Sequence, residues 1–205
     1  DKIMELKIFQ EIIQNKNKTT GEIPGRKGDL ASPFYIIDIV MKYDIEKMLS
    51  EIKTLPREDL LSYVQLQSWK ENPNPSDAFE HVGGRNGWVP ETKLDLAYTY
   101  KIFDIPYINS IIDELKLYKA RITFLKEKEC YTWHRDMHPK VQIPIVSDPF
   151  TCFMVVQSKF DKYDLGEIHR MPVGESYYID TTLHHTAING GIPERIHLIG
   201  TVTGP

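Results

Sequence analysis

The chain has 205 residues, 41% hydrophobic and 11% aromatic, with a net charge of −4 and a pI near 6.0. This composition is typical of a globular protein and excludes a low-complexity chain, while the acidic balance argues against nucleic acid as a partner. No apolar run is long enough to span a membrane, and two cysteines are too few for a disulfide scaffold, so we expect a cytoplasmic protein.

The N-terminal third mixes helical, extended and loop patterns. Lys2–Gln14 has apolar residues at roughly helical spacing, and the stretch 15–33, rich in glycine and proline, is predicted to be a loop. A buried strand is expected over Phe34–Val40. From Asp44, a good N-cap, apolar residues at helical spacing predict a helix that Pro56 ends.

The middle of the chain contains one long stretch of turn residues. Ser62–Trp69 alternates as a strand does, and Lys70–Thr92, with several prolines and glycines, is too long for an ordinary connection. This stretch is expected to be either a flap over a substrate or a solvated loop. A second helix is predicted from Pro106, at its first turn, to Leu115.

After Tyr118 the pattern changes to short strand-like segments separated by turns. The predicted strands are Ala120–Lys126, Tyr131–Asp136, Val141–Val146, Thr151–Gln157, Ser176–Asp180, Leu183–Ile188 and Arg195–Val202. They predict a mainly β protein with flanking helices (α+β), whose core is a double-stranded β-helix, the cupin-like jelly roll. We expect one domain over residues 1–205, with this core at 119–203, an N-terminal extension at 1–118 packed outside it, and a possible flap at 70–92.

The tripeptide His134-Arg135-Asp136 is the strongest chemical signal. In an extended segment residues i and i+2 point to the same side, so His134 and Asp136 would present an imidazole and a carboxylate together. A second histidine would complete the ligand set of a non-haem Fe(II) oxygenase. The candidates downstream are His169, His184 and His185, and only one of the adjacent pair can point inward from an extended backbone.

Arg195 is the candidate anion-binding residue. It follows His185 across the turn Asn189–Pro193 and can face the same cavity, whether the turn closes a hairpin or leads to the opposing sheet. A guanidinium binds a carboxylate through two parallel hydrogen bonds and stays charged when partly desolvated. The alternative is an ordinary ion pair with a carboxylate such as Glu194 or Glu175.

The order of these residues resembles the 2-oxoglutarate- and Fe(II)-dependent dioxygenases, and among them most the aspartyl/asparaginyl β-hydroxylase-like family. The stretches that carry the resemblance are Trp133–Asp136, Ile143–Ile145, Gly174–Asp180, His185–Asn189 and Arg195–Leu198. The family pattern has an asparagine four residues after the distal histidine and then the arginine. This pattern selects His185 over His184.

The resemblance implies a catalytic metal site and a cosubstrate site. The implied Fe(II) ligands are His134, Asp136 and His185, with 2-oxoglutarate chelating the metal and Arg195 binding its far carboxylate. Lys140 or Gln142 is expected to contact the cosubstrate as well, although Gln142 replaces a more common histidine. The implied reaction uses O2 to hydroxylate an amino-acid side chain, free or in a protein, and releases succinate and CO2.

Three other functions remain open. These are a cupin-like metalloenzyme that does not use 2-oxoglutarate, a jelly-roll binding module that keeps a metal only structurally, and an oxygenase of nucleic-acid bases, which the absence of a Lys/Arg-rich stretch disfavours. His138 and His197 are expected at the surface or around the site, and Tyr131, Trp133 and Met154 as an apolar shield of the metal. The substrate, a small molecule, peptide or protein, and the oligomeric state are not predicted.

Overall fold

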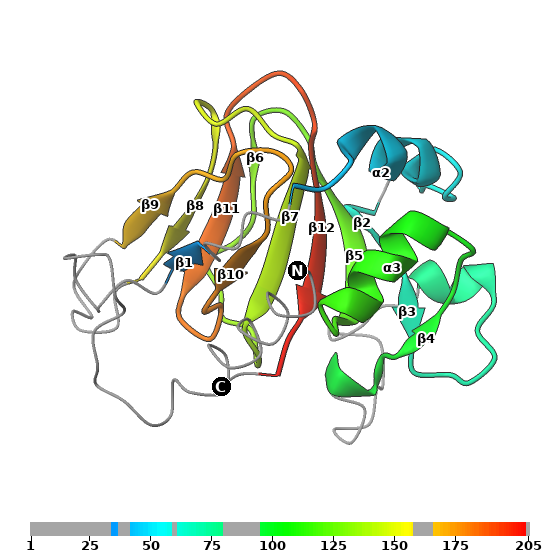
Figure 1. The fold of residues 1–205 in the computed structure, drawn as a ribbon. Helices are drawn as coiled ribbons and strands as arrows, with labels where there is room; N and C mark the ends of the chain where they lie inside the picture. The colour runs from blue at the N-terminus through cyan, green and yellow to red at the C-terminus, as the bar shows by residue number, and fades with distance from the viewer. Residues whose placement is uncertain (1–33, 37–41, 59–60, 80–94, 158–165, 204–205) are drawn as a thin grey trace.

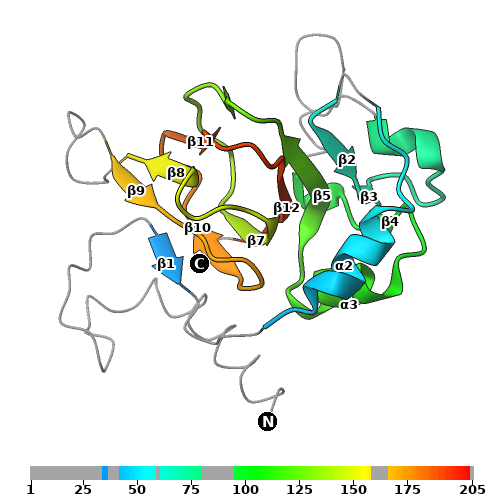
Figure 2. The ribbon, with the colours of Figure 1, turned by 90° about the horizontal axis from the view of Figure 1, so that it is seen from above.

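Two antiparallel β-sheets face each other across a shared interior (Figures 1 and 2). The computed structural model describes residues 34–36, 42–58, 61–79, 95–157 and 166–203. Within these residues the larger sheet has the strand order β1 (Phe34–Ile36), β10 (Tyr177–Ile179), β7 (Lys140–Val146), β12 (Arg195–Thr201), β5 (Tyr118–Leu125) and β2 (Tyr63–Gln65). The smaller sheet has the order β6 (Glu129–Cys130), β11 (His185–Asn189), β8 (Cys152–Val156) and β9 (Glu167–His169).

The larger sheet has an apolar outer face and a mixed inner face. Successive side chains of a strand point to opposite faces, and in β7 the outward residues Val141, Ile143 and Ile145 belong to the main hydrophobic core. Lys140 and Gln142 of the same strand therefore point to the interior between the sheets. This alternation places apolar residues against the helices and polar ones toward the smaller sheet.

Helix α2 (Ile45–Ile52) covers part of the outer face, as Figure 2 shows. The carboxylate of Asp44 accepts a hydrogen bond from the backbone N–H of Lys47 at 3.1 Å, which satisfies one of the free donors at the helix start. Met48 and Ile52, one turn apart, are buried. The helix therefore forms where its cap and its apolar stripe were predicted.

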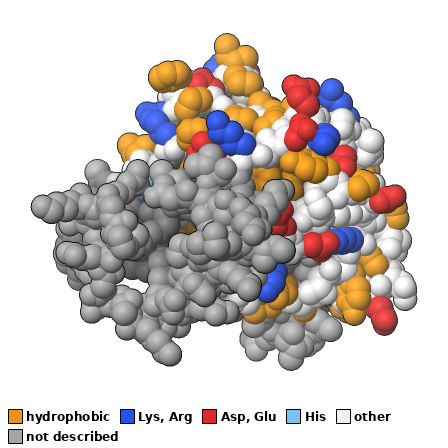
Figure 3. All heavy atoms as spheres, in the orientation of Figure 1, with side chains coloured by type: hydrophobic (Ala, Val, Ile, Leu, Met, Phe, Trp, Pro, Cys, Tyr) orange, Lys and Arg blue, Asp and Glu red, His pale blue; other side chains and the backbone are white. Residues whose placement is uncertain are grey.

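Helix α3 (Pro106–Glu114) packs beside α2 and begins with its proline in the first turn, where a missing N–H costs nothing. The Glu51 carboxylate of α2 accepts hydrogen bonds from the N–H groups of Tyr107 and Ile108, at 2.7 and 2.8 Å, and so caps α3 from a neighbouring helix. Among the described residues, no helix has the length and apolar character needed to cross a membrane. Figure 3 shows acidic and basic side chains interspersed with hydrophobic ones on the described part of one face.

The predicted fold class, a mainly β jelly roll with helices outside it, is confirmed, but some predicted strands are wrong. Tyr131–Asp136 is not a strand: β6 ends at Cys130, and the chain continues from there as a loop. The predicted strand Ser62–Trp69 is divided into two strands at Leu66. The N–H of Leu66 bonds to the carbonyl of Ala120, and its carbonyl accepts from the N–H of Ile102. After Leu66 the chain forms a separate pair, β3 (Gln67–Ser68) with β4 (Tyr100–Lys101). Strand β9 was not predicted.

Several predicted segments lie outside the described residues. These are the helix Lys2–Gln14, the loop 15–33, the end of the strand Phe34–Val40, and residues 80–92 of the possible flap. The described part of the flap contains a short 3-10 helix, η1 (Pro75–Phe79), and a second, η2 (Asp95–Ala97), comes after it in the chain.

Candidate metal centre

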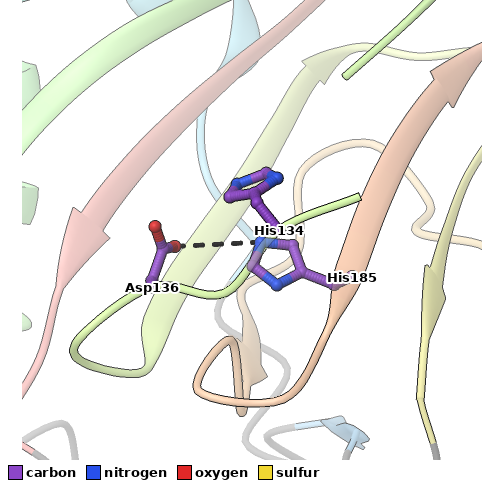
Figure 4. A group of neighbouring side chains, drawn as sticks. All are labelled: His134, Asp136 and His185. Atoms are coloured by element: carbon purple, nitrogen blue, oxygen red, sulfur yellow. Dashed lines mark ion pairs between the residues drawn. The ribbon is translucent and has the colours of Figure 1, made fainter. Parts of the chain in front are cut away.

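His134, Asp136 and His185 come together, with one ligand atom from each within 4.8 Å of the others. Figure 4 shows the three side chains turned toward one another, His185 at the start of β11 and the other two on the loop that leads to β7. The sequence prediction that these residues share a site agrees with this geometry. The predicted strand Tyr131–Asp136, which was expected to align His134 and Asp136, is absent, so another feature must position these two residues.

Backbone pairing with the segment around β11 positions the loop. The N–H of His134 bonds to the carbonyl of His185 at 3.1 Å, and the N–H of His185 bonds back at 2.8 Å, forming an isolated β-bridge. Residues directly opposite each other in an antiparallel bridge have side chains on the same face, and the two imidazole centroids lie 4.4 Å apart. The N–H of Asp136 then bonds to the carbonyl of Thr181 at 2.8 Å, which fixes the carboxylate beside them.

In both imidazoles Nδ1 is hydrogen-bonded to a backbone carbonyl, which leaves Nε2 to bind a metal. Nδ1 of His134 lies 2.6 Å from the carbonyl of Thr132, and Nδ1 of His185 lies 2.9 Å from that of Leu183. A carbonyl only accepts, so each Nδ1 carries a hydrogen, and Nε2 is the nitrogen left to bind a metal. Burial also lowers the pKa of His185, which favours the neutral, metal-binding form.

The carboxylate completes a donor set for a divalent transition metal. Oδ2 of Asp136 lies 3.8 Å from Nε2 of His185 (Figure 4). Two imidazoles and one carboxylate, with each imidazole oriented by a hydrogen bond from its other nitrogen, are the ligands of metal sites that leave coordination positions open. The residues present therefore fit Fe(II) or a similar ion.

Lys140 lies beside this carboxylate in a buried network of charges. Its Nζ donates to Oδ2 of Asp95 and to Oγ1 of Thr201, both at 2.7 Å, and lies 4.0 Å from Oδ2 of Asp136. Asp95 also accepts from Lys119 at 2.6 Å. Burial alone would raise the pKa of Asp95, but the two ammonium groups outweigh it and hold that pKa below its usual range.

Sequence reasoning missed Asp95. It lies just beyond the predicted flap, far along the chain from both lysines, and no local pattern links the three residues. Its effect is to hold Lys140 next to Asp136 with part of the lysine charge already balanced.

Among the described residues, Arg195 is the largest buried side chain with unfilled hydrogen-bond donors, at 1% exposure. The turn after β11 carries the chain to the opposing sheet, so Arg195 opens β12 and faces the interior. Its Nη2 donates to Oε1 of Gln142 at 3.2 Å, whereas Nε and Nη1 have no partner. Burial lowers its pKa to about 10, so the group is still charged at neutral pH.

The expected surface carboxylates do not pair with Arg195. Glu194 forms an ion pair with Arg57, and Glu175 accepts a hydrogen bond from the hydroxyl of Tyr177 at 2.8 Å. A buried guanidinium with two unfilled nitrogens and no carboxylate partner fits an anionic ligand.

Gln142 connects Arg195 to its surroundings. Its Oε1 accepts from Arg195 and from Nδ1 of His197, each at 3.2 Å, and its Nε2 lies 3.2 Å from Sδ of Met154. His197 was expected at the surface or around the site, and its complete burial excludes the first of these positions. Burial, and secondarily Arg195, lowers the pKa of His197 well below its ordinary value.

The other histidine candidates lie away from the triad. His184 stacks against Trp133, with ring centroids 6.2 Å apart, and its Nδ1 lies 3.1 Å from Oε1 of Gln157. His169 is on β9, with Nε2 3.6 Å from Oε2 of Glu167. Of the expected apolar shield, Tyr131 and Met154 pack in the cluster between the sheets, but Trp133 is 47% exposed and does not.

Asn189 has a structural role in the turn before β12. Its Nδ2 donates to the carbonyls of Leu125 and Pro193, at 3.0 and 2.8 Å, and its Oδ1 accepts from the N–H of Gly191 at 3.0 Å. These bonds fix the path of the turn and hence the position at which Arg195 enters the interior.

Comparisons with known proteins support the fold. No family model matches the chain, and no curated protein matches it in sequence. A solved oxidoreductase of the 2OG-Fe(II) oxygenase family from Burkholderia pseudomallei is similar in structure, with a TM-score of 0.53 and 8% identity over 100% of this chain and 92% of that one. HygX from Streptomyces hygroscopicus, solved with nickel and 2-oxoglutarate bound, gives a TM-score of 0.50 and 8% identity over 84% of each chain.

Proposed function

We propose that this chain is a 2-oxoglutarate- and Fe(II)-dependent oxygenase that hydroxylates an amino-acid side chain, free or within a protein, and releases succinate and CO2. The observation that carries the proposal is Arg195, buried and charged with unfilled donors, on the interior that also holds His134, Asp136 and His185. A metal triad alone suits many metalloproteins, whereas a triad with a buried anion-binding arginine suits a metal-chelating dicarboxylate.

Each residue has a defined part in this proposal. His134, Asp136 and His185 would hold Fe(II), and the bound metal would supply the oxidising chemistry that O2 and 2-oxoglutarate drive. Arg195 would bind the far carboxylate of 2-oxoglutarate with one of its unpartnered nitrogens, Nε or Nη1, together with the second N–H of Nη2. Gln142 would orient the guanidinium through the other N–H of Nη2.

Lys140 contributes charge near the metal. Two of its three N–H donors are used by Asp95 and Thr201, and the third is available on the side where Asp136 lies at 4.0 Å. We assign to it a contact with Asp136 or with the metal-binding end of 2-oxoglutarate. Gln142, engaged by Arg195 and His197, orients the arginine and is not free to contact the cosubstrate with its carbonyl.

The structural neighbours support the kind of activity and not the substrate. HygX was solved with nickel and 2-oxoglutarate, and the Burkholderia protein belongs to the 2OG-Fe(II) oxygenase family, but each is only 8% identical to this chain. The proposed side-chain substrate rests on the resemblance of the motif stretches to the aspartyl/asparaginyl β-hydroxylase-like family.

Anaerobic addition of Fe(II) and 2-oxoglutarate tests the proposal. We expect a visible metal-to-ligand charge-transfer band that His134→Ala removes, and succinate release when O2 and a suitable amino acid or peptide are supplied. No band in the wild-type protein, or a band that survives His134→Ala, would reject the proposal. Tightly held zinc without turnover would instead favour a non-catalytic binding module.

A further inference from the structure

Cationic side chains gather on the inner face of the larger sheet, and they differ in how their charge is balanced. Lys119 and Lys140 share Asp95, and Arg195 is assigned above to 2-oxoglutarate. One cation is left. Arg121 of β5 is half-buried, and within the described residues it has no carboxylate partner.

Strand alternation places Arg121 on the same face as the metal centre. Its neighbours Ala120 and Ile122 belong to the outer core, so Arg121 points inward. Across the sheet it stands opposite Ile199, which stands opposite Gln142, so Arg121 is two strands, or about 10 Å, from Gln142.

Arg121 is also close to the charge network beside the metal. Burial lowers the pKa of Lys119, and the charges of Arg121 and then Lys140 act in the same direction. Lys140 in turn lies 4.0 Å from the metal-site carboxylate of Asp136. Arg121 therefore lies on the same inner face as Lys119 and Lys140, beside the edge strand β2.

Gln65 gives a second, independent observation at the same place. It stands directly opposite Arg121 in the β2–β5 pair, is 1% exposed, and has no hydrogen-bond partner at either Oε1 or Nε2. A buried amide that makes no hydrogen bond destabilises the fold, so its presence calls for a partner.

A nearby glutamine shows what a structural glutamine does in this strand region. Gln67 accepts from the N–H of Ala120 at 2.8 Å and donates to the carbonyl of Leu117 at 3.1 Å, so its amide is satisfied by the backbone. Gln65 makes no such bonds. Tyr63, on the same face as Gln65, places its ring 5.9 Å from the Arg121 guanidinium carbon and supports that group by a cation–π contact.

We propose that Arg121, Gln65 and Tyr63 form a subsite that binds the α-carboxylate and α-ammonium of a free amino acid, whose side chain extends toward the metal centre. Arg121 binds the carboxylate with two donors, Nε2 of Gln65 adds a third, and Oε1 of Gln65 accepts from the ammonium group. This assignment rests on the proposed function for the reaction and adds the substrate class, a free amino acid rather than a protein side chain.

Binding of free L-amino acids, their α-carboxamides and their N-acetyl derivatives tests the subsite without relying on turnover. The readout is the rise in melting temperature of the purified protein as each compound is titrated. We expect at least one free amino acid to bind the wild-type protein, and its carboxamide and N-acetyl forms to bind about 10- to 100-fold more weakly. Arg121→Gln should weaken binding of the free acid by a similar factor.

A matched control and a second variant separate binding from folding. Arg170→Gln removes an exposed arginine that donates to the backbone carbonyls of Pro149 and Phe150 and lies over the ring of Phe153. This variant should bind the amino acid as the wild type does. Gln65→Leu should raise the melting temperature of the ligand-free protein, because it removes an unsatisfied buried amide, and should still weaken amino-acid binding.

Several results would overturn the subsite. These are equal binding by Arg121→Gln and wild type, equal binding of N-acetyl and free forms, and no amino acid that binds the wild-type protein. The charge-transfer band with Fe(II) and 2-oxoglutarate is a separate readout of the proposed function. If that band is absent while Arg121-dependent binding is present, the oxygenase assignment fails and the subsite stands.

Discussion

The two faces of the larger sheet are buried in opposite ways. At the outer face, Ile122 and Leu198 of the sheet and Met48 and Ile108 of the helices are all fully buried among apolar side chains. At the inner face, Leu125 packs with Met154 and Ala187 of the smaller sheet in a smaller apolar cluster. Arg195, His197 and Gln142 are buried on the same face of the larger sheet. The outer face of the larger sheet is therefore packed with apolar side chains, whereas the inner face has polar side chains in part of its packing.

The unsatisfied polar atoms show what the inner face gains. Nε and Nη1 of Arg195, Nε2 of His197 and both amide atoms of Gln65 are buried without hydrogen-bond partners. Each such atom destabilises the folded state relative to a satisfied one, so a sheet selected only to fold would not contain them. On the helical side of the sheet such atoms are fewer, being Oη of Tyr43 and Oδ1 of Asn109 among the described residues. The outer core therefore supplies most of the stability, and the inner face presents more donors to ligands.

The largest effect on stability is expected from the outer face. Ile122→Ala removes a fully buried side chain of β5 and should lower the free energy of unfolding by about 2–5 kcal/mol. Thr123→Val, at the next residue on the inner face, removes only a long hydrogen bond of 3.4 Å to His197 and should cost about 1 kcal/mol or less. Urea unfolding of both variants makes the measurement, and equal losses would contradict the division between the faces.

Arg195→Met should have the opposite effect on stability. It replaces a buried, charged and incompletely bonded side chain with an apolar one of similar volume, so the metal-free protein should gain up to about 1–4 kcal/mol. The same change should raise the concentration of 2-oxoglutarate needed to form the charge-transfer band by about 100-fold, because it removes a charged, bidentate contact. A variant that is less stable and binds 2-oxoglutarate normally would show that Arg195 serves the fold.

What the sequence could predict also differs between the outer and inner faces of the larger sheet. The outer face is encoded by local periodicity: the apolar residues of α2, α3 and β7 recur at the spacing of their own element, so the helices and most strands were found. The three residues that the structure brings together were grouped from the sequence because His134 and Asp136 are two residues apart and because the family pattern selects His185.

The features that were missed depend on tertiary contacts. Asp95 reaches Lys140 and Gln65 stands opposite Arg121 only after distant strands pair, and no period in the sequence marks either pair. The loop at 131–136 was mistaken for a strand because its spacing suits one, although what aligns His134 is a single bridge to His185. His197 has the period of its strand, but its complete burial and the contact of its Nδ1 with Gln142 depend on how distant strands pack together.

The smallest expected effect is a change in the pH dependence of stability. Burial, and then Arg195, lowers the pKa of His197 well below its ordinary value, so the folded protein keeps this residue neutral where the unfolded chain takes up a proton. The unfolded state then binds more protons, and stability should fall as the pH drops below about 6.5, by at most about 1.4 kcal/mol per pH unit for this group.

His197→Gln can still donate to Gln142 but cannot titrate, so its stability should fall less between about pH 7 and pH 5. Because burial also lowers the pKa of His185, part of the slope should remain in the variant. Urea unfolding at several pH values measures the slope, and an unchanged slope would mean that His197 takes up a proton in the folded interior, with Arg195 facing a second positive charge instead of a neutral ring.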